Sequence, residues 1–376
     1  MQSNKEAMDS AKYVIIGAGL AGMATAYGLA CRGESDVVVL EKESFPGLHS
    51  SGRNAAMIRQ VVPNKHILSL SKKGAGFFHG QPQGWQNPVP FANSGSLLLG
   101  REQGWSDLLQ DAESARSAGV DLETWDAERV LKAVPCTKGG DFEGGVYCPG
   151  DGVTDTDGLI GGFSGAARAE GIRVETECEV LAIHVEKSRV AGVETNRGFI
   201  RTAAVVNASG PWASMIAGLA GALAIEFTPM RRHLYYTGAL GWVDQDWPFV
   251  WDVSRDVYFR PESAGLLLSP CDETPAAPGI PTVEESAQDL LADKLAGSFP
   301  RLLGLPIARS WAGLRTFAPD RMFVIGWDPR VEGFFWVAGL GGHGVTTSPA
   351  VGALAAEELL SGKRETSSPF SPARFI

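Results

Sequence analysis

The stretch Tyr13-Val-Ile-Ile-Gly-Ala-Gly-Leu-Ala-Gly22 decides the fold of this chain. Its first four residues are apolar and partly β-branched, which predicts a buried strand that leads straight into glycines 17, 19 and 22. A small-residue segment typical of a helix follows, and a second apolar run, Asp36-Val-Val-Val-Leu40, ends beside Glu41. The order strand, glycine turn, helix, strand and acid predicts a dinucleotide-binding βαβ unit.

Each residue of this unit has an expected role. Gly17 allows the tight turn, Gly19 leaves room for a pyrophosphate, and Gly22 lets the helix pack closely on the strand. The free N–H groups and the dipole of the helix N-terminus favour the phosphates. Glu41 is expected to accept a hydrogen bond from a ribose 2′-hydroxyl and to repel a 2′-phosphate, which disfavours NADP. The motif alone does not separate FAD from NAD, and a turn that serves only packing is the alternative.

Composition limits the class of protein. The chain has 376 residues, enough for two domains, with 44% hydrophobic and 20% charged residues. Its formal charge of -10 and pI near 5.2 argue against nucleic acid or an anionic membrane as partner. Residues 1–12 lack the apolar core of a signal peptide, and no run approaches the roughly 18 apolar residues of a membrane span. We therefore expect a cytoplasmic protein without a transmembrane segment.

Cysteine and histidine spacing indicates no metal site. The five cysteines are scattered and never form a CxxC pair, and the six histidines show no HxxxH or HExxH spacing. The odd number of cysteines also provides no disulfide framework.

Two further turns follow expected strands. Residues 205–208 form an apolar run that leads into Gly210 and a helix over 212–220, and residues 333–338 lead into Gly339, Gly341 and Gly344. No strand returns after Gly344, so a second complete nucleotide fold cannot form there. We expect instead a glycine-walled helix N-terminus for the pyrimidine edge of a flavin, with Ser348 capping a helix over 349–360. Three such turns favour one long cofactor, FAD, with NAD second.

The remaining chain predicts helices and a hairpin-rich sheet. We expect helices over 64–80, 105–119, 122–134 and 284–299, and one capped within 151–157 that ends at Gly171. A strand is expected over 91–99, and residues 172–176, 179–185, 190–195 and 199–202 indicate hairpin strands. Aromatic-rich runs between 226 and 268 predict a mostly antiparallel sheet.

Cationic residues in this second region are candidates for substrate binding. Arg315 lies in Trp311-Ala-Gly-Leu-Arg-Thr-Phe317, Arg231 and Arg232 begin the aromatic sheet, and Tyr258 lies on a neighbouring run. An arginine can bind a carboxylate through two hydrogen bonds, and a tyrosine can add a directed one. Surface or structural ion pairs are the alternative.

With these motifs the chain resembles the FAD-dependent D-amino acid oxidase/dehydrogenase superfamily, which includes glycine and sarcosine oxidases. The D-arginine dehydrogenases of bacteria are the most similar branch. The resemblance covers nearly the whole chain and rests on GAGLAG at 17–22, HSSGRNAA at 49–56, VNASGPW at 206–212, PMRRH at 229–233, WAGLRTF at 311–317 and EGFFWVAGLGGHG at 332–344.

The resemblance implies roles for particular residues. Arg232, Arg315 and Tyr258 are expected to hold the substrate carboxylate, Gly342 to meet the amino group, and His343 to border the site. The reaction implied is hydride transfer from Cα to flavin N5, which gives an imino acid and then a 2-oxo acid. The expected FAD contacts are Gly17, Gly19, Gly22, Glu41, Lys42, Ser50, Ser51, Arg53, Asn54, Ala55, Ala208, Gly210, Trp212, Gly341, Gly342, Gly344, Val345 and Thr346.

The implied architecture is an α/β fold. A Rossmann-like FAD-binding domain of glutathione-reductase type, expected over 11–60, 150–222 and 311–365, is interleaved with an α+β substrate domain. The substrate domain, expected over 61–149 and 223–310, is built on a mostly antiparallel sheet.

Departures from the family bear on substrate and cofactor. Ser96 stands where the arginine-oxidising branch has an acid, and residues 57–62 offer Met57, Arg59 and Val62. With Phe249 and Trp251 in the same region, we expect a neutral or hydrophobic D-amino acid. Secondary amines, N-methyl amino acids, 2-hydroxy acids and a non-catalytic flavin-binding subunit are alternatives.

The linkage to FAD and the electron acceptor are separate questions. Asn54 replaces the flavin-linking histidine of some relatives, and no cysteine lies near Arg315 in the sequence, so we expect FAD to be bound non-covalently. The sequence leaves the electron acceptor, quinone or O2, and the oligomeric state open.

Overall fold

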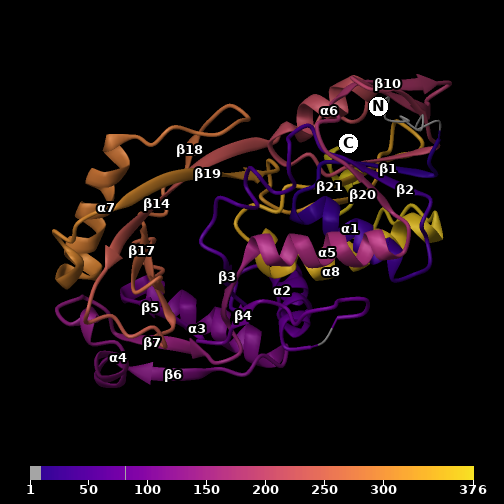
Figure 1. The fold of residues 1–376 in the computed structure, drawn as a ribbon. Coiled ribbons are helices and arrows are strands. Elements are labelled where there is room, and N and C mark those ends of the chain that lie inside the picture. The colour runs from indigo at the N-terminus through magenta and orange to yellow at the C-terminus, as the bar shows by residue number, and fades with distance from the viewer. Residues whose placement is uncertain (1–9, 81) are drawn as a thin grey trace.

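The structure, a computed structural model, describes residues 10–80 and 82–376, so most of the N-terminal segment used for the signal-peptide expectation lies outside it. Figure 1 shows one lobe built around β1, β2, β20 and β21 with α1, α5 and α8, and a second lobe that curves away through β14, β17, β5 and β7. No helix among the described residues is long and apolar enough to cross a membrane.

The first lobe contains a six-stranded sheet. Only β20 is antiparallel to its neighbour, β21; the other pairs are parallel. Along the sheet the order is β20 (Val324–Trp327), β21 (Phe334–Ala338), β13 (Ala204–Asn207), β1 (Tyr13–Ile16), β2 (Val37–Leu40) and β9 (Arg173–Glu175). Tyr13 and Ile15 pack in one core cluster and Val14 and Ile16 in another, so both faces of β1 are covered. This burial on both faces is why the strand is a continuous apolar run.

Helices cover one face of this sheet, and a small meander covers the other. The helices are α1 (Leu20–Ala30), α2 (Lys65–Phe78), α5 (Thr156–Ala169) and α8 (Gly344–Ser361), with α1 packed on both α5 and α8. The backbones of α1 and α8 come so close that a Cβ on Gly352 would lie 2.1 Å from the Ala24 carbonyl oxygen. The meander consists of β10 (Val180–Glu186), β11 (Arg189–Thr195) and β12 (Gly198–Arg201), joined by α6 (Ala213–Ala220).

The second lobe is a nine-stranded, mainly antiparallel sheet. Its path is β18 (Thr274–Pro275), β14 (Thr228–Ala239), β17 (Gly265–Ser269), β16 (Val257–Glu262), β15 (Phe249–Asp252), β5 (Ser96–Gly100), β7 (Gly144–Cys148) and β6 (Glu123–Asp126), with β19 (Arg309–Phe317) on β14. Helices α3 (Glu102–Ser117), α4 (Ala127–Ala133) and α7 (Glu285–Ser298) belong to this lobe. A third sheet, β3 (Met57–Ile58), β8 (Gly152–Thr154) and β4 (Phe91–Ala92), lies between the lobes.

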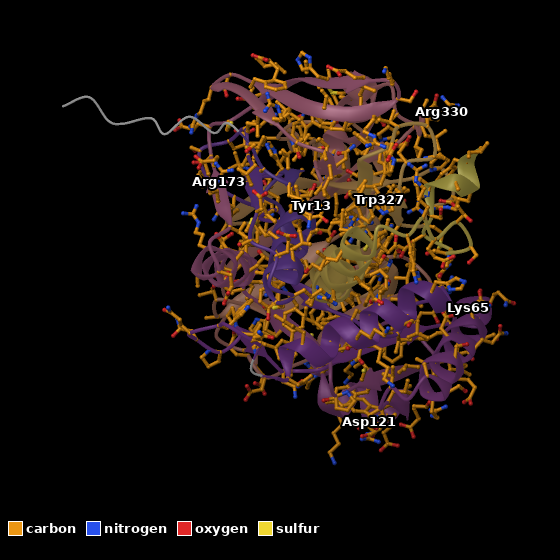
Figure 2. All side chains as sticks on the ribbon, turned by 90° about the vertical axis from the view of Figure 1, so that its right-hand side faces the viewer. Tyr13, Lys65, Asp121, Arg173, Trp327 and Arg330 are labelled. Atoms are coloured by element: carbon orange, nitrogen blue, oxygen red, sulfur yellow. The ribbon has the colours of Figure 1, made fainter. Side chains whose placement is uncertain are left out.

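Figure 2, turned by 90°, places Tyr13 inside the first lobe and Asp121 at the far end of the second. The expected fold class is confirmed: a dinucleotide-binding parallel sheet is joined to an antiparallel substrate sheet. However, β19 lies in the substrate sheet, although residues 311–317 were expected in the FAD-binding part.

Several local expectations were wrong. Residues 123–126 form β6 before the short α4, because Thr124 and Trp125 pair with β7. The expected strand over 91–99 is divided into β4 and β5. Residues 173–175 pair in parallel with β2 and are not part of a hairpin, because α5 provides the crossover that a parallel pair needs.

The last helix begins earlier than expected. It starts at Gly344 and includes Pro349. Pro349 has no N–H for the Val345 carbonyl oxygen, and the Ser348 hydroxyl donates to that oxygen at 3.3 Å instead. Ser348 therefore supplies a hydrogen bond that Pro349 cannot make inside the helix, and it does not cap the helix start.

Glu358 on α8 predicts a pH-dependent stability. Its side chain is buried, and burial together with Glu365 and Glu357 raises its pKa to about 7. The pKa of Glu358 in the folded protein exceeds its unfolded value of 4.5. The contribution of the Glu358 carboxyl to the free energy of unfolding is therefore fully present below about pH 4.5, where the group is protonated, and is lost as the pH rises through about 7. We expect Glu358→Gln to raise the unfolding free energy at pH 8 by about 1–3 kcal/mol and to change little at pH 4.

Urea unfolding at both pH values measures the difference. Glu128→Gln, at an exposed position on α4, is the matched control. Equal stability of Glu358→Gln and wild type at pH 8 would contradict the prediction.

Candidate active site

One cavity of about 1060 Å³ connects the two lobes. It runs past the turns after β1, β13 and β21 and ends on the face formed by β14, β15, β16 and β19. Small-molecule pockets are usually about 300–1,000 Å³, so this one suits a long cofactor together with a substrate. Every residue to which the family resemblance gave a role in binding FAD or substrate lines this cavity except Gly22.

The turn after β1 has the expected geometry. Gly17 has a φ of +104°, and a Cβ on Gly22 would lie 1.9 Å from the Gly17 carbonyl oxygen, so Gly22 serves helix–strand packing. A Cβ on Gly19 would contact only the Ser51 hydroxyl, at 3.0 Å, and otherwise faces the cavity. That hydroxyl accepts a hydrogen bond from the Leu20 N–H, so Ser51 also supports the start of α1.

The end of β2 is tied back to the glycine turn. The Glu41 carboxylate accepts hydrogen bonds from the Ala18 N–H at 2.9 Å and the Glu43 N–H at 3.0 Å. Nearby, the Lys42 ammonium lies 3.7 Å from the centroid of the Trp212 ring. Glu41, Lys42 and Trp212 therefore form one wall at the β2 end of the cavity.

The loop over 49–56 forms the next wall. Asn54 holds its shape, since the side-chain amide donates to the Ser50 and Ser51 carbonyl oxygens and the side-chain oxygen accepts from the Ala56 N–H. The Arg53 Nε donates to the Leu48 carbonyl oxygen. In contrast, the Ser50 hydroxyl is buried without a hydrogen-bond partner among the described residues.

The N-terminus of α8 closes this part of the cavity. Gly341, Gly344 and Val345 line it, and the Thr346 hydroxyl accepts a hydrogen bond from the Arg59 N–H at 3.0 Å. The residues present fit FAD on three counts: the start of α1 suits a pyrophosphate, the buried Ser50 hydroxyl has no partner in the protein, and the α8 N-terminus favours a partly anionic group.

Two arginines meet at the substrate end. Met230 pairs with Arg315 across β14 and β19, so Arg232, two residues along β14, points to the same face. The Arg232 Nε donates to the Asp272 carbonyl oxygen at 2.9 Å, while its buried Nη1 has no partner among the described residues. Burial and the Arg232 charge lower the pKa of Arg315 to about 10. This pair of cations is unfavourable alone and suits a carboxylate ligand.

A buried histidine supports this arrangement. The His233 Nε2 accepts a hydrogen bond from the Glu284 N–H, so its Nδ1 carries the proton and donates to the Asp272 carboxylate at 2.7 Å. Asp272 also accepts from the His233 N–H. These bonds hold the Asp272 backbone where its carbonyl oxygen orients Arg232.

Tyr258 and His343 complete the substrate end in their neutral forms. Burial raises the pKa of Tyr258, which keeps its hydroxyl as a hydrogen-bond donor. Burial and the charges of Arg59 and Arg315 lower the pKa of His343 to about 3. A Cβ on Gly342 would lie 3.0 Å from the Arg315 Cζ, so this glycine faces the guanidinium directly.

The expected apolar side-chain pocket is not what the structure contains. Phe249 and Ser96 are buried outside the cavity lining, and the Ser96 hydroxyl donates to the Asp151 carboxylate at 2.7 Å. Met57, Val62 and Trp251 do line the cavity, but the Arg59 guanidinium covers the Trp251 ring at 4.3 Å.

Other differences concern residues on or near the β14 edge. Arg231 is outside the lining and pairs with Glu284, so it serves structure. Cys271 lines the cavity near Arg232 and Arg315, although no cysteine is close to Arg315 in the sequence. Sequence reasoning also missed Glu273, which bonds to Arg321 and contacts Arg232.

Of the cavity residues Arg59, Cys271 and Glu273, only Arg59 could be placed in the cavity from the sequence pattern. Alternate residues of an extended segment share a face, so placing Met57 in the cavity implies that Arg59 faces it too. Cys271 and Glu273 follow β17 in an irregular segment, where no periodicity indicates which way a side chain points.

Comparisons with known proteins agree with this site. A family model described as FAD dependent oxidoreductase (DAO) matches residues 12–358. Human mitochondrial sarcosine dehydrogenase is 26% identical over 377 residues, which cover 95% of this chain and 40% of that protein. The mouse mitochondrial pyruvate dehydrogenase phosphatase regulatory subunit is 25% identical over 374 residues, which cover 94% of this chain and 42% of that protein. The crystal structure of L-proline dehydrogenase from P. horikoshii has a TM-score of 0.88 and 26% identity, and the match covers 98% of each chain.

These similarities refine the expectations. The chain spans less than half the length of the two curated relatives. The particular resemblance to D-arginine dehydrogenase is not supported, because the similar proteins include sarcosine dehydrogenase and L-proline dehydrogenase. FAD as the cofactor is confirmed. The match over residues 12–358 shows that the chain belongs to the FAD dependent oxidoreductase (DAO) family.

Proposed function

We propose that this protein oxidises the carbon–nitrogen bond of an amine that carries a carboxylate. The observation that carries the proposal is the Arg232–Arg315 pair: Arg315 faces Gly342, just before α8, and the buried Nη1 of Arg232 is unpartnered among the described residues. The bound FAD supplies the acceptor for the hydride lost by the substrate carbon. The protein contributes position and charge.

Each residue has a role in this proposal. Arg232 and Arg315 hold the carboxylate, and Tyr258 donates a hydrogen bond to it. The amine must be neutral before its carbon can lose hydride. The neighbouring arginine charges disfavour an ammonium ion, so the site favours the neutral amine. His343, with a pKa of about 3, adds no competing charge and is too weak a base to deprotonate an alkylammonium ion.

Two substrate classes fit the carboxylate site. A D-amino acid would give an imino acid and, after hydrolysis, a 2-oxo acid and ammonia. A secondary amine such as an N-methyl amino acid or a cyclic imino acid is the second class, and the relatives named sarcosine dehydrogenase and L-proline dehydrogenase favour it. We propose quinone or O2 as the electron acceptor.

Anaerobic reduction of the bound flavin tests the proposed reaction without assuming an acceptor. We expect bleaching near 450 nm, the usual flavin absorbance region, by at least one amine in a panel of D- and L-amino acids, N-methyl amino acids and proline, and none by 2-hydroxy acids of matched size. If no amine bleaches a flavin that dithionite reduces, the proposal is wrong, and a non-catalytic role becomes the better interpretation. A relative named as a regulatory subunit provides the precedent for that role.

Removing one arginine tests the carboxylate site. We expect Arg315→Gln to lower kcat/KM by about 10- to 150-fold, because a hydrogen bond to a charged group contributes about 1.5–3 kcal/mol. Steady-state kinetics with the best amine measures the loss. Arg309→Gln is the control, since Arg309 is exposed on the same strand and outside the cavity. An Arg315→Gln enzyme as active as this control would exclude Arg315 from substrate binding.

We also propose that FAD is bound without a covalent link. Acid precipitation of the yellow protein should release the flavin into the supernatant. Cys271 is the residue to examine if it does not, because this thiol lines the cavity. Flavin retained in the pellet of wild type and released from Cys271→Ser would contradict non-covalent binding and identify the link.

A further inference from the structure

We propose that the substrate carries a second carboxylate, and that Arg59 binds it while Arg232 and Arg315 bind the first. The substrate class is therefore an acidic amino acid or a secondary amine with two carboxylates. This inference rests on the proposed function and specifies the substrate of the same site.

Arg59 is a cation with no ion-pair partner among the described residues. It lines the cavity, and its guanidinium carbon lies over the Trp251 ring, 4.3 Å from the ring centroid. Among the described residues the guanidinium makes no hydrogen bond or ion pair; only the backbone N–H of Arg59 is bonded, to Thr346. A half-buried charge that lacks an anionic partner in the protein favours a ligand anion at this position.

The acids around Arg59 form no ion pair with it among the described residues. Asp151 is the largest opposing charge, but its carboxylate oxygens accept hydrogen bonds from Gln60 and Ser96 instead. Asp256 and Asp111 act on Arg59 only at longer range, and neither forms an ion pair with it. The remaining charged or titratable groups that influence the area are Cys271, His343 and Arg315.

The two anion positions lie at different places on one sheet face. Trp251 on β15 pairs with Tyr258 on β16, and the path continues through β17 to β14, which carries Arg232. Three strand spacings of about 4.8 Å separate the backbones of β15 and β14, or about 14 Å in total. Tyr258 lies between them, and its ring centroid is 5.1 Å from that of Trp251. A substrate over Tyr258 therefore reaches a guanidinium at each end.

Substrates with a second carboxylate, each matched to one that has a neutral group there, test this on the FAD-loaded enzyme; the neutral partner is an amide in two pairs and an N-methyl amine in the third. The pairs are glutamate with glutamine and aspartate with asparagine, in both hands, and iminodiacetate with sarcosine. We expect kcat/KM to favour the acid by about tenfold or more, because only the acid gives Arg59 a charged partner. In Arg59→Gln the ratio should fall to about one, and Arg59→Lys should retain part of it.

Arg129→Gln is the matched control. Arg129 also stacks on a tryptophan, at 4.4 Å from the Trp125 ring, but it is paired with Glu123 and lies outside the cavity. This variant should keep the acid-to-amide ratio of wild type, so a change confined to Arg59→Gln is specific to the cavity.

A binding measurement independent of turnover uses glutarate and butyrate, which cannot be oxidised as amines. We expect glutarate to raise the melting temperature of wild type more than butyrate does, and this excess should disappear in Arg59→Gln. Equal acid and amide rates, or a ratio unchanged by Arg59→Gln, would overturn the inference.

Three further outcomes separate this inference from its alternatives. If Arg59→Gln slows every substrate equally and alters the flavin spectrum, Arg59 acts on the flavin and the inference is wrong. If neutral amines reduce the flavin and acidic ones do not, the proposed function survives and the second carboxylate does not. If no amine reduces it, the proposed function fails, and the glutarate measurement still decides whether Arg59 binds an anion.

Discussion

Close backbone contact around the first glycine turn is the constraint on which the structure depends. Gly22 brings α1 against the turn after β1, and Gly352 brings α8 against α1. Both contacts leave no space for a side chain, so the N-termini of α1 and α8 are held beside the same sheet edge. The cavity for one extended cofactor follows from this packing, since one helix N-terminus would hold its phosphates and the other its ring system.

Charge then determines what the rest of the cavity can bind. The whole chain is acidic, yet the substrate end gathers Arg59, Arg232 and Arg315. Among the described residues, Arg232 has only a 3.5 Å ion pair with Glu273, and Arg59 and Arg315 form none. The Asp272 carboxylate binds His233, and Arg232 is oriented by the Asp272 carbonyl oxygen. The Asp272 carboxylate therefore does not neutralise the charge of Arg232. A buried cationic site of this kind is stable only with anions, so the substrate is part of its electrostatic balance.

The similar proteins differ in how much of their length this chain covers. The chain spans 40% of the length of human sarcosine dehydrogenase and 42% of the mouse pyruvate dehydrogenase phosphatase regulatory subunit. The similarity to L-proline dehydrogenase, in contrast, extends over both complete chains. Shared architecture explains the common cofactor, and the residues that cover Trp251 and Tyr258 are where substrate preference can diverge.

The sequence by itself determined the dinucleotide unit, the three glycine turns and FAD, whereas the substrate roles of Arg232 and Arg315 were implied only by the family resemblance. The first three follow from short-range patterns: strand period, glycine spacing and helix starts depend on neighbouring residues. Only the tertiary structure decided that β9 joins the parallel sheet, that β19 crosses to the substrate sheet, and that Cys271 and Glu273 line the cavity. Those placements depend on pairing between segments far apart in the chain, and local periodicity contains no information about the partner.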